Sequence, residues 1–136
     1  MSNPELALIN PPGLANQTDR GFSQLAILPP GAKVVYISGQ FGADITGQIV
    51  SDDYAGQLRQ SFRNLKIAIE AAGAVPQGVA KLTILIVNHS DDKMPPLREE
   101  LKALFGTHCP TITLMPVPRL ARSNMLFEIE AVAIVP

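Results

Sequence analysis

The sequence predicts an α+β domain in which two helices cover one face of a mixed β-sheet. Two segments, about 51–72 and 95–105, carry apolar residues at helical spacing, and each is followed by a glycine. Strand-like segments precede, separate and follow them, in the order β-β-α-β-α-β-β. We found no repeat and no internal linker in the 136 residues, so we expect one domain, 1–136, with residues 1–20 as an irregular arm that can add a short edge strand.

The first half of the chain predicts a hairpin followed by a helix. Apolar runs at 22–28 and 33–38 flank the turn residues Pro29-Pro30-Gly31, so we expect them to pair. Ser51-Asp52-Asp53 supplies capping groups for the first helix, which Gly73 ends. The inward face of this helix is expected to carry Leu58, Phe62, Leu65, Ile69 and Ala72.

The second half predicts a buried strand, a helix and two closing strands. The apolar run 82–87 is short and continuous, which indicates a strand covered on both faces. Two prolines, Pro95 and Pro96, fit the first turn of the second helix, which Gly106 ends. Its inward residues are expected to be Leu97, Leu101, Leu104 and Phe105. The closing strands, about 111–117 and 125–135, flank a short polar turn.

Composition excludes several classes of function. The formal net charge is −1, the pI is about 6.1 and the basic residues are scattered, so nucleic acid is not an expected partner. The single cysteine and the two histidines have no spacing typical of a metal site. Neither a signal peptide nor an apolar run long enough to span a membrane is visible, so we expect a soluble cytoplasmic protein.

The last strand carries two acidic residues, Glu128 and Glu130, in an otherwise apolar segment. Residues two apart point to the same face of a strand, and carboxylates are rarely buried without partners. We expect Leu126, Glu128, Glu130, Val132 and Ile134 on the open sheet face, and Phe127, Ile129, Ala131, Ala133 and Val135 against the helices. An apolar open face predicts self-association, with the glutamates in an interface.

Several motifs together resemble the RidA/YjgF family, formerly called endoribonuclease L-PSP. They are Phe22-Ser23-Gln24, Val35-Tyr36-Ile37-Ser38-Gly39-Gln40, Asn64-Leu65-Lys66, Glu70-Ala71-Ala72-Gly73, Val79-Ala80-Lys81-Leu82-Thr83 and Glu128-Ile129-Glu130-Ala131-Val132-Ala133. The resemblance covers almost the whole chain. It implies a chorismate-mutase-like fold, a homotrimer with clefts between subunits, and hydrolysis of reactive enamines and imines to 2-keto acids and ammonia without a cofactor.

One departure from the family pattern concerns substrate binding. RidA binds the substrate carboxylate with the arginine of a Pro-Ala-Arg-Ser motif, and the matching residues here are Pro110-Thr111-Ile112-Thr113. Isoleucine has no donor for a carboxylate, whereas arginine offers a planar fork of N–H groups. We therefore expect binding of simple 2-imino acids to be weaker by about tenfold to a few hundredfold.

Two further departures fall on expected cleft positions. Phe22 stands where RidA usually has a tyrosine, which removes one hydroxyl from the cleft. Arg98 falls near a position where RidA commonly has a cleft-lining asparagine. We hypothesise that Arg98 is a relocated cation for an anionic ligand, and the alternative is a solvated helix arginine.

The resemblance also assigns candidate roles to a glutamate and a glycine. Glu128 aligns with the family glutamate that holds the attacking water, and a raised pKa would let it act as a general base. The alternative is that Glu128 and Glu130 only stabilise the assembly. Gly39 matches the family's cleft glycine, which lets a ligand approach backbone N–H groups; the alternative is an ordinary glycine at a strand end.

Two functions of different class are consistent with these residues. The first is a hydrolase or deaminase that acts on an imine, an enamine or a related small metabolite in a cleft between subunits. The second is a non-catalytic trimer that binds or senses a small molecule. Cys109 has no sequence sign of an activated thiol, and the adjacent His108 points to the other face of a strand.

Overall fold

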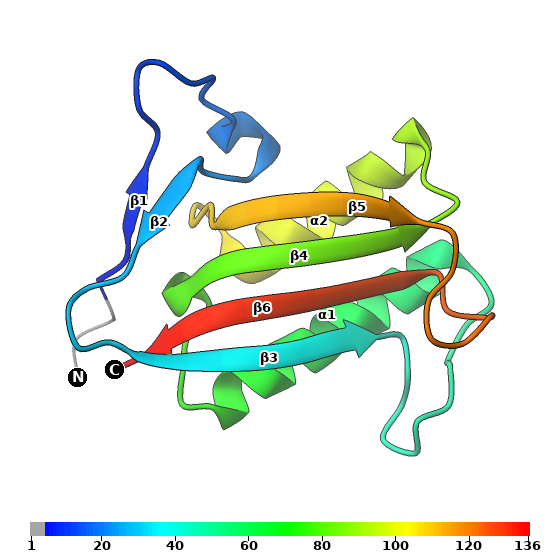
Figure 1. Cartoon of the computed structure of the whole chain (residues 1–136). Helices are drawn as coiled ribbons and strands as arrows, with labels where there is room; N and C mark the ends of the chain where they lie inside the picture. Colours follow the sequence, from blue (N-terminus) through cyan, green and yellow to red (C-terminus); the bar gives the residue numbers. More distant parts are fainter. Residues whose placement is uncertain (1–4) are drawn as a thin grey trace.

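The fold consists of a four-stranded mixed sheet with two helices on one face and a two-stranded ribbon at one end (Figure 1). The structure is a computed structural model that describes residues 5–136, so residues 1–4 of the predicted arm lie outside the described part. The elements are β1 (Ala7–Ile9), η1 (Thr18–Arg20), β2 (Leu25–Ile27), β3 (Lys33–Phe41), α1 (Tyr54–Ala71), η2 (Pro76–Gly78), β4 (Val79–Val87), η3 (Asp91–Lys93), α2 (Met94–Phe105), β5 (Thr111–Val117) and β6 (Phe127–Val135). The predicted fold class is confirmed.

The strand order in the main sheet is β3-β6-β4-β5 (Figure 1). Strands β4 and β5 run parallel, because α2 carries the chain back across the sheet between them, whereas β6 runs antiparallel to both β3 and β4. The two closing strands form as predicted, but they are not neighbours, since β6 inserts between β3 and β4.

The hairpin predicted from 22–28 and 33–38 is wrong. Strand β2 pairs with β1, in the register Leu25 opposite Ile9, while β3 pairs with β6. The turn does form at Pro29, whose carbonyl accepts a hydrogen bond from the Ala32 N–H at 3.2 Å. The nine-residue strand β3 gains far more ladder hydrogen bonds from the equally long β6 than the three-residue β2 could offer.

The helices form and pack as their sequence patterns predict. The Asp53 carboxylate caps α1 by accepting a hydrogen bond from the Gly56 N–H at 2.7 Å, and Gly73 ends it with φ +76°. The core beneath the helices contains Leu58, Phe62, Leu65, Ile69, Leu97, Leu101, Phe105, Phe127, Ile129, Ala131 and Ala133, with Ala72, Leu104 and Val135 packed at its border. No helix of residues 5–136 is long and apolar enough to cross a membrane.

The sheet face away from the helices is partly open. Burial alternates along β4: Leu82, Ile84 and Ile86 are buried under the helices, whereas Lys81, Thr83, Leu85 and Val87 are half-buried on the other side. The prediction that this strand is covered on both faces is therefore wrong for a single chain, because both helices pack on the same face (Figure 1). The open face also carries Tyr36, which is 80% exposed.

Candidate functional site

The Glu128 side chain lies against the backbone of Gly39. A Cβ atom added to Gly39 would lie 2.5 Å from Cδ and 2.8 Å from Cγ of Glu128, closer than non-bonded atoms approach. Any larger residue at position 39 would therefore displace the glutamate. Two of the residues that the resemblance assigned to the cleft are thus brought together on the open sheet face, one from β3 and one from β6.

A β-bulge in β3 forms this contact. Ile37 pairs with Ala131 and Gln40 pairs with Ile129, so Ser38 and Gly39 together lie opposite the single residue Glu130. A bulge of this kind bends the strand and changes the direction of the side chains beside it. It places the backbone of Gly39 next to the carboxyl group of Glu128 rather than in the regular ladder.

Two effects raise the pKa of Glu128 above its ordinary value. The larger is burial, which disfavours the charged carboxylate, and the smaller is repulsion from the nearby Glu130. Glu128 is half-buried and Glu130 is exposed, although both point to the open face. A carboxyl group with a raised pKa at a partly dry surface can accept a proton from water more readily than an ordinary surface glutamate.

The open face also holds a cation that the sequence analysis did not single out. The Lys81 Nζ donates a hydrogen bond to the Thr113 Oγ1 at 2.6 Å, across the parallel pair β4–β5. Lys81 lies on the same face as Glu130, which pairs with Thr83 two residues further along β4. The alternation of polar residues along β4 was the signal that could have indicated this position.

Ile112 packs toward the helices instead of facing the glutamates. It pairs with Leu82 of β4, which is fully buried beneath the helices, and it is half-buried at the border of the core. Its neighbours Thr111 and Thr113 make polar contacts instead: the Thr111 Oγ1 donates to the Ala80 carbonyl at 2.7 Å. In this chain the position that carries the family arginine is occupied by an apolar packing residue.

Phe22 lies at the junction of the N-terminal arm and the main sheet. It is half-buried, and the next residue, Ser23, is buried and donates its N–H to the Pro110 carbonyl at 3.1 Å, just before β5. The Asn10 side chain donates to the Ser23 hydroxyl at 3.3 Å. These contacts fix the arm beside the start of β5.

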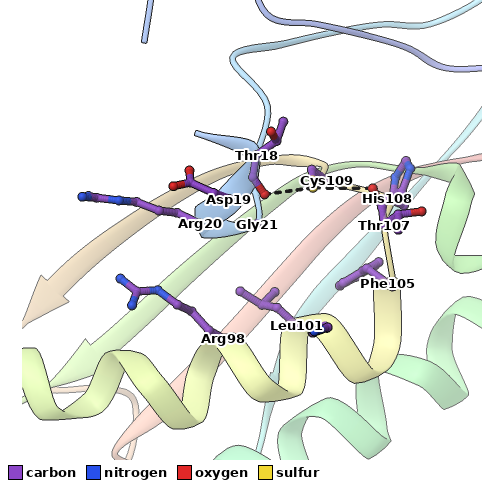
Figure 2. Close-up of a pocket in the computed structure, with 12 residues that line it drawn as sticks. Thr18, Asp19, Arg20, Gly21, Arg98, Leu101, Phe105, Thr107, His108 and Cys109 are labelled. Carbon is purple, nitrogen blue, oxygen red and sulfur yellow. Dashed lines mark hydrogen bonds between the residues drawn. The ribbon is translucent and has the colours of Figure 1, made fainter. Parts of the chain in front are cut away.

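Arg98 lies on the helix side of the sheet, at the mouth of a cavity between α2 and η1 (Figure 2). Its side chain is exposed and extends in the same direction as that of Arg20. Glu128 is on the opposite face, so one chain does not bring Arg98 and Glu128 together. Whether Arg98 reaches the substrate of a neighbouring copy stays a prediction.

The chain is similar to proteins of one known family in sequence and in structure. The family model described as "Endoribonuclease L-PSP" matches residues 14–135. The chain belongs to the RidA/YjgF (endoribonuclease L-PSP) family. It is 34% identical over 103 residues to the 2-iminobutanoate/2-iminopropanoate deaminase of Homo sapiens, and this match covers 75% of the chain and 73% of the human protein.

Two solved structures of RidA/YjgF relatives show how far the likeness extends. The Rid family protein YyfB from Yersinia pestis superposes with a TM-score of 0.89 at 30% identity, over 96% of this chain and 98% of that one. TdcF from E. coli, which was solved with bound serine, superposes with a TM-score of 0.66 at 30% identity, over 80% and 85% of the two chains. A small molecule therefore binds at least one member of this structural family.

Other polar residues of this RidA/YjgF member have structural roles. The His108 Nε2 lies 2.8 Å from the Val79 carbonyl and joins the end of α2 to the start of β4. The Cys109 Sγ lies 3.6 Å from the carbonyl oxygens of both Thr18 and Thr107, either of which can accept its single S–H. Burial raises the pKa of this thiol, which disfavours the reactive thiolate. Within residues 5–136 no group of three His, Cys, Asp or Glu side chains could hold a metal ion.

Proposed function

We propose that this protein is a cytoplasmic, homotrimeric hydrolase that deaminates reactive imines, enamines or related small metabolites. The observation that carries the proposal is Glu128: a half-buried carboxyl group with a raised pKa, held against Gly39 on the open sheet face. In this proposal Glu128 holds the attacking water and accepts a proton from it as the water oxygen bonds to the C=N carbon. Both water protons are passed to the nitrogen, which leaves as ammonia when the C–N bond breaks and the carbonyl product forms. The cleft is completed by a neighbouring subunit, and no cofactor or metal takes part.

Gly39 leaves room for the Glu128 carboxyl group beside its backbone, and we predict that the substrate binds next to both residues. Phe22, Ile112 and Arg98 are the further substrate-binding residues that we predict. Because Ile112 and Arg98 lie on the other side of the sheet from Glu128 in one chain, they would contact the substrate of a neighbouring subunit's Glu128. Ile112 makes the cleft less suited to a carboxylate, so we expect simple 2-imino acids to be poor substrates and imines without a carboxylate at that position to be better ones.

The apolar environment of Ile112 also supports a second candidate function. Because this residue packs at the core border, no cation of β5 is available at the position where RidA binds the substrate carboxylate. A trimer that binds or senses a small molecule without converting it would need Gly39 and the cleft, but not the general base. The two candidates differ in whether Glu128 accelerates a reaction.

The test generates 2-aminoacrylate and longer imines enzymatically and measures release of the carbonyl product with and without the protein. Glu128→Gln should lower the acceleration by about a hundredfold or more, the usual contribution of a general base. Glu70→Gln is the matched control, because Glu70 is exposed on α1. If no imine in a broad panel is hydrolysed faster than in buffer, or if Glu128→Gln is as active as wild type, the hydrolase proposal fails and the binding function is favoured.

A further inference from the structure

A cavity of about 360 Å³ lies between α2, from Arg98 to its C-terminus, and the 3-10 turn η1, on the helix side of the sheet. Figure 2 shows its two walls: η1 contributes Asp19 and Arg20, and α2 contributes Arg98, Leu101 and Phe105. The volume falls within the range of small-molecule sites, about 300–1,000 Å³. The cavity is formed by one chain, so it requires no partner subunit.

The mouth of this cavity is electropositive. Arg20 and Arg98 are both exposed, come from different elements that line the same cavity and extend toward the same side of Figure 2, and no hydrogen bond joins either guanidinium to another residue drawn there. Lys102 adds a third cation one turn further along α2, against the single carboxylate of Asp19. Each guanidinium group can offer paired N–H donors to an anion bound at this mouth.

The interior of the cavity is apolar. Leu101 and Phe105 line it, and both also belong to the buried core, so their positions are fixed. Arg98, Leu101 and Phe105 follow one another at spacings of three and four, which places them along one face of α2. The distance along the helix axis from Arg98 to Phe105 is about 10 Å, at a rise of 1.5 Å per residue.

We propose that this cavity binds a small organic monocarboxylate, with the carboxylate between Arg20 and Arg98 and an apolar body of up to about 10 Å over Leu101 and Phe105. Two features favour a ligand with one negative charge, such as a carboxylate, over a phosphate ester, which carries more negative charge. Asp19 lies at the same mouth, and the cavity ends at the C-terminus of α2, whose free carbonyls carry partial negative charge. The charge therefore fits at the Arg98 end and the apolar body at the Gly106 end.

The cavity shares Arg98 with the substrate-binding residues proposed above, but Glu128 does not line it. Glu128 lies on the opposite face of the sheet, and binding in the cavity needs neither this glutamate nor turnover. Binding to Glu128→Gln should therefore match binding to wild type, so the two proposals can fail separately.

The probe for the test is 3-phenylpropanoate, with the neutral 3-phenylpropanamide as its matched analogue. A titration followed by two-dimensional ¹H–¹⁵N NMR should show saturable shifts of backbone amides in Thr18–Gly21 and in the 98–109 segment, and calorimetry gives the affinity. The amide should bind about tenfold more weakly, because it loses the charge-assisted contacts. Equal affinity for acid and amide, or shifts located elsewhere, would overturn the proposal.

Four variants test the assignment of the residues. Arg98→Gln and Arg20→Gln should each weaken binding of 3-phenylpropanoate by about tenfold. Arg63→Gln, which removes an exposed arginine of α1, should not change it, and Asp19→Asn should strengthen it by a few fold. All four residues are exposed, so the variants are expected to fold, and an unchanged unfolding temperature verifies this. If Arg63→Gln weakens binding as much as Arg98→Gln, the attraction is a non-specific charge effect and the site is refuted.

Discussion

Glu128 occupies the space that a side chain on Gly39 would need, since a Cβ there would lie 2.5 Å from the Glu128 Cδ. The contact joins β3 to β6 at a bulge, and it links a backbone feature of the sheet to the proposed catalytic carboxyl group. The glycine is therefore required by its neighbour, and this relationship can be tested with a pair of substitutions.

Gly39→Ala should cost about 1–2 kcal/mol of folding free energy, because the new methyl group overpacks the contact with Glu128. In the Glu128→Ala background the atoms that clash are absent, and φ at Gly39 is not in the left-handed region. There the same substitution should stabilise the fold by about 0.5 kcal/mol, through lower entropy of the unfolded chain. A double-mutant cycle by urea unfolding measures this change of sign. Equal effects in both backgrounds would mean that the two residues are not coupled.

Glu128→Gln should change how stability depends on pH. Burial and Glu130 raise the pKa of Glu128 in the folded state, so the folded protein binds this proton more tightly than the unfolded chain does. The resulting stabilisation is complete below the unfolded pKa of about 4.3 and is lost as pH rises through the higher folded pKa. Relative to wild type, Glu128→Gln should therefore gain stability between acidic and neutral pH.

The unfolding temperatures of wild type and Glu128→Gln, measured at a series of pH values, test this pH dependence. Glu70→Gln again serves as the control, since that residue is exposed on α1. A difference between Glu128→Gln and wild type that is constant from acidic to neutral pH would contradict the raised pKa.

Gln57 connects the start of α1 to the segment that leads into β6. It is fully buried: its Nε2 donates to the carbonyls of Ser51 at 3.0 Å and Asn124 at 2.8 Å, and its Oε1 accepts from the Leu126 N–H at 2.8 Å. Gln57→Ala should cost about 3 kcal/mol, because it leaves buried backbone groups without partners. Gln60→Ala, which loses one side-chain contact with Asn64, should cost about 1 kcal/mol or less. Similar losses for the two variants would show that the three contacts of Gln57 are not the source of its effect.

Ile112→Arg tests whether the missing guanidinium limits activity on 2-imino acids. We expect a stability loss of about 1–2 kcal/mol from the lost apolar contacts at the core border, with the charged end of the new side chain reaching solvent. Hydrolysis of 2-aminoacrylate should rise, whereas Ile67→Arg, which adds the same charge at an exposed position of α1, should not raise it. If Ile112→Arg folds but gains no activity, this position is not what restricts the substrate.

The proposed trimer is tested through the open sheet face. Tyr36 is 80% exposed there in a single chain, so Tyr36→Lys should disrupt an assembly that buries this face. Ile67→Lys changes a residue that is 64% exposed on α1 and should leave the assembly intact. Light scattering should give three times the 14.6 kDa chain mass for wild type and Ile67→Lys. A monomeric wild type would refute both the trimer and the inter-subunit cleft.

Local patterns predicted the helices and strands well. The Asp53 cap, the glycines at 73 and 106 and the apolar spacing of both helices were correct, because each depends on residues within a few positions of one another. The pairing of β2 was not predictable in this way. Turn residues at Pro29–Gly31 indicate a reversal of the chain, but they do not determine which strand becomes the hydrogen-bonding partner.

Sequence alone determined the family, the two-layer fold and the residue types of the candidate site, including isoleucine at position 112. Tertiary structure decided what those residues touch. The bulge sets Gly39 against Glu128, 89 positions away, and one cavity is lined by Arg20 and Arg98, which are 78 positions apart. The burial that raises the pKa of Glu128 likewise arises only in the folded sheet. Such contacts depend on strand order and helix packing, so the periodicity of residues along the chain cannot predict them.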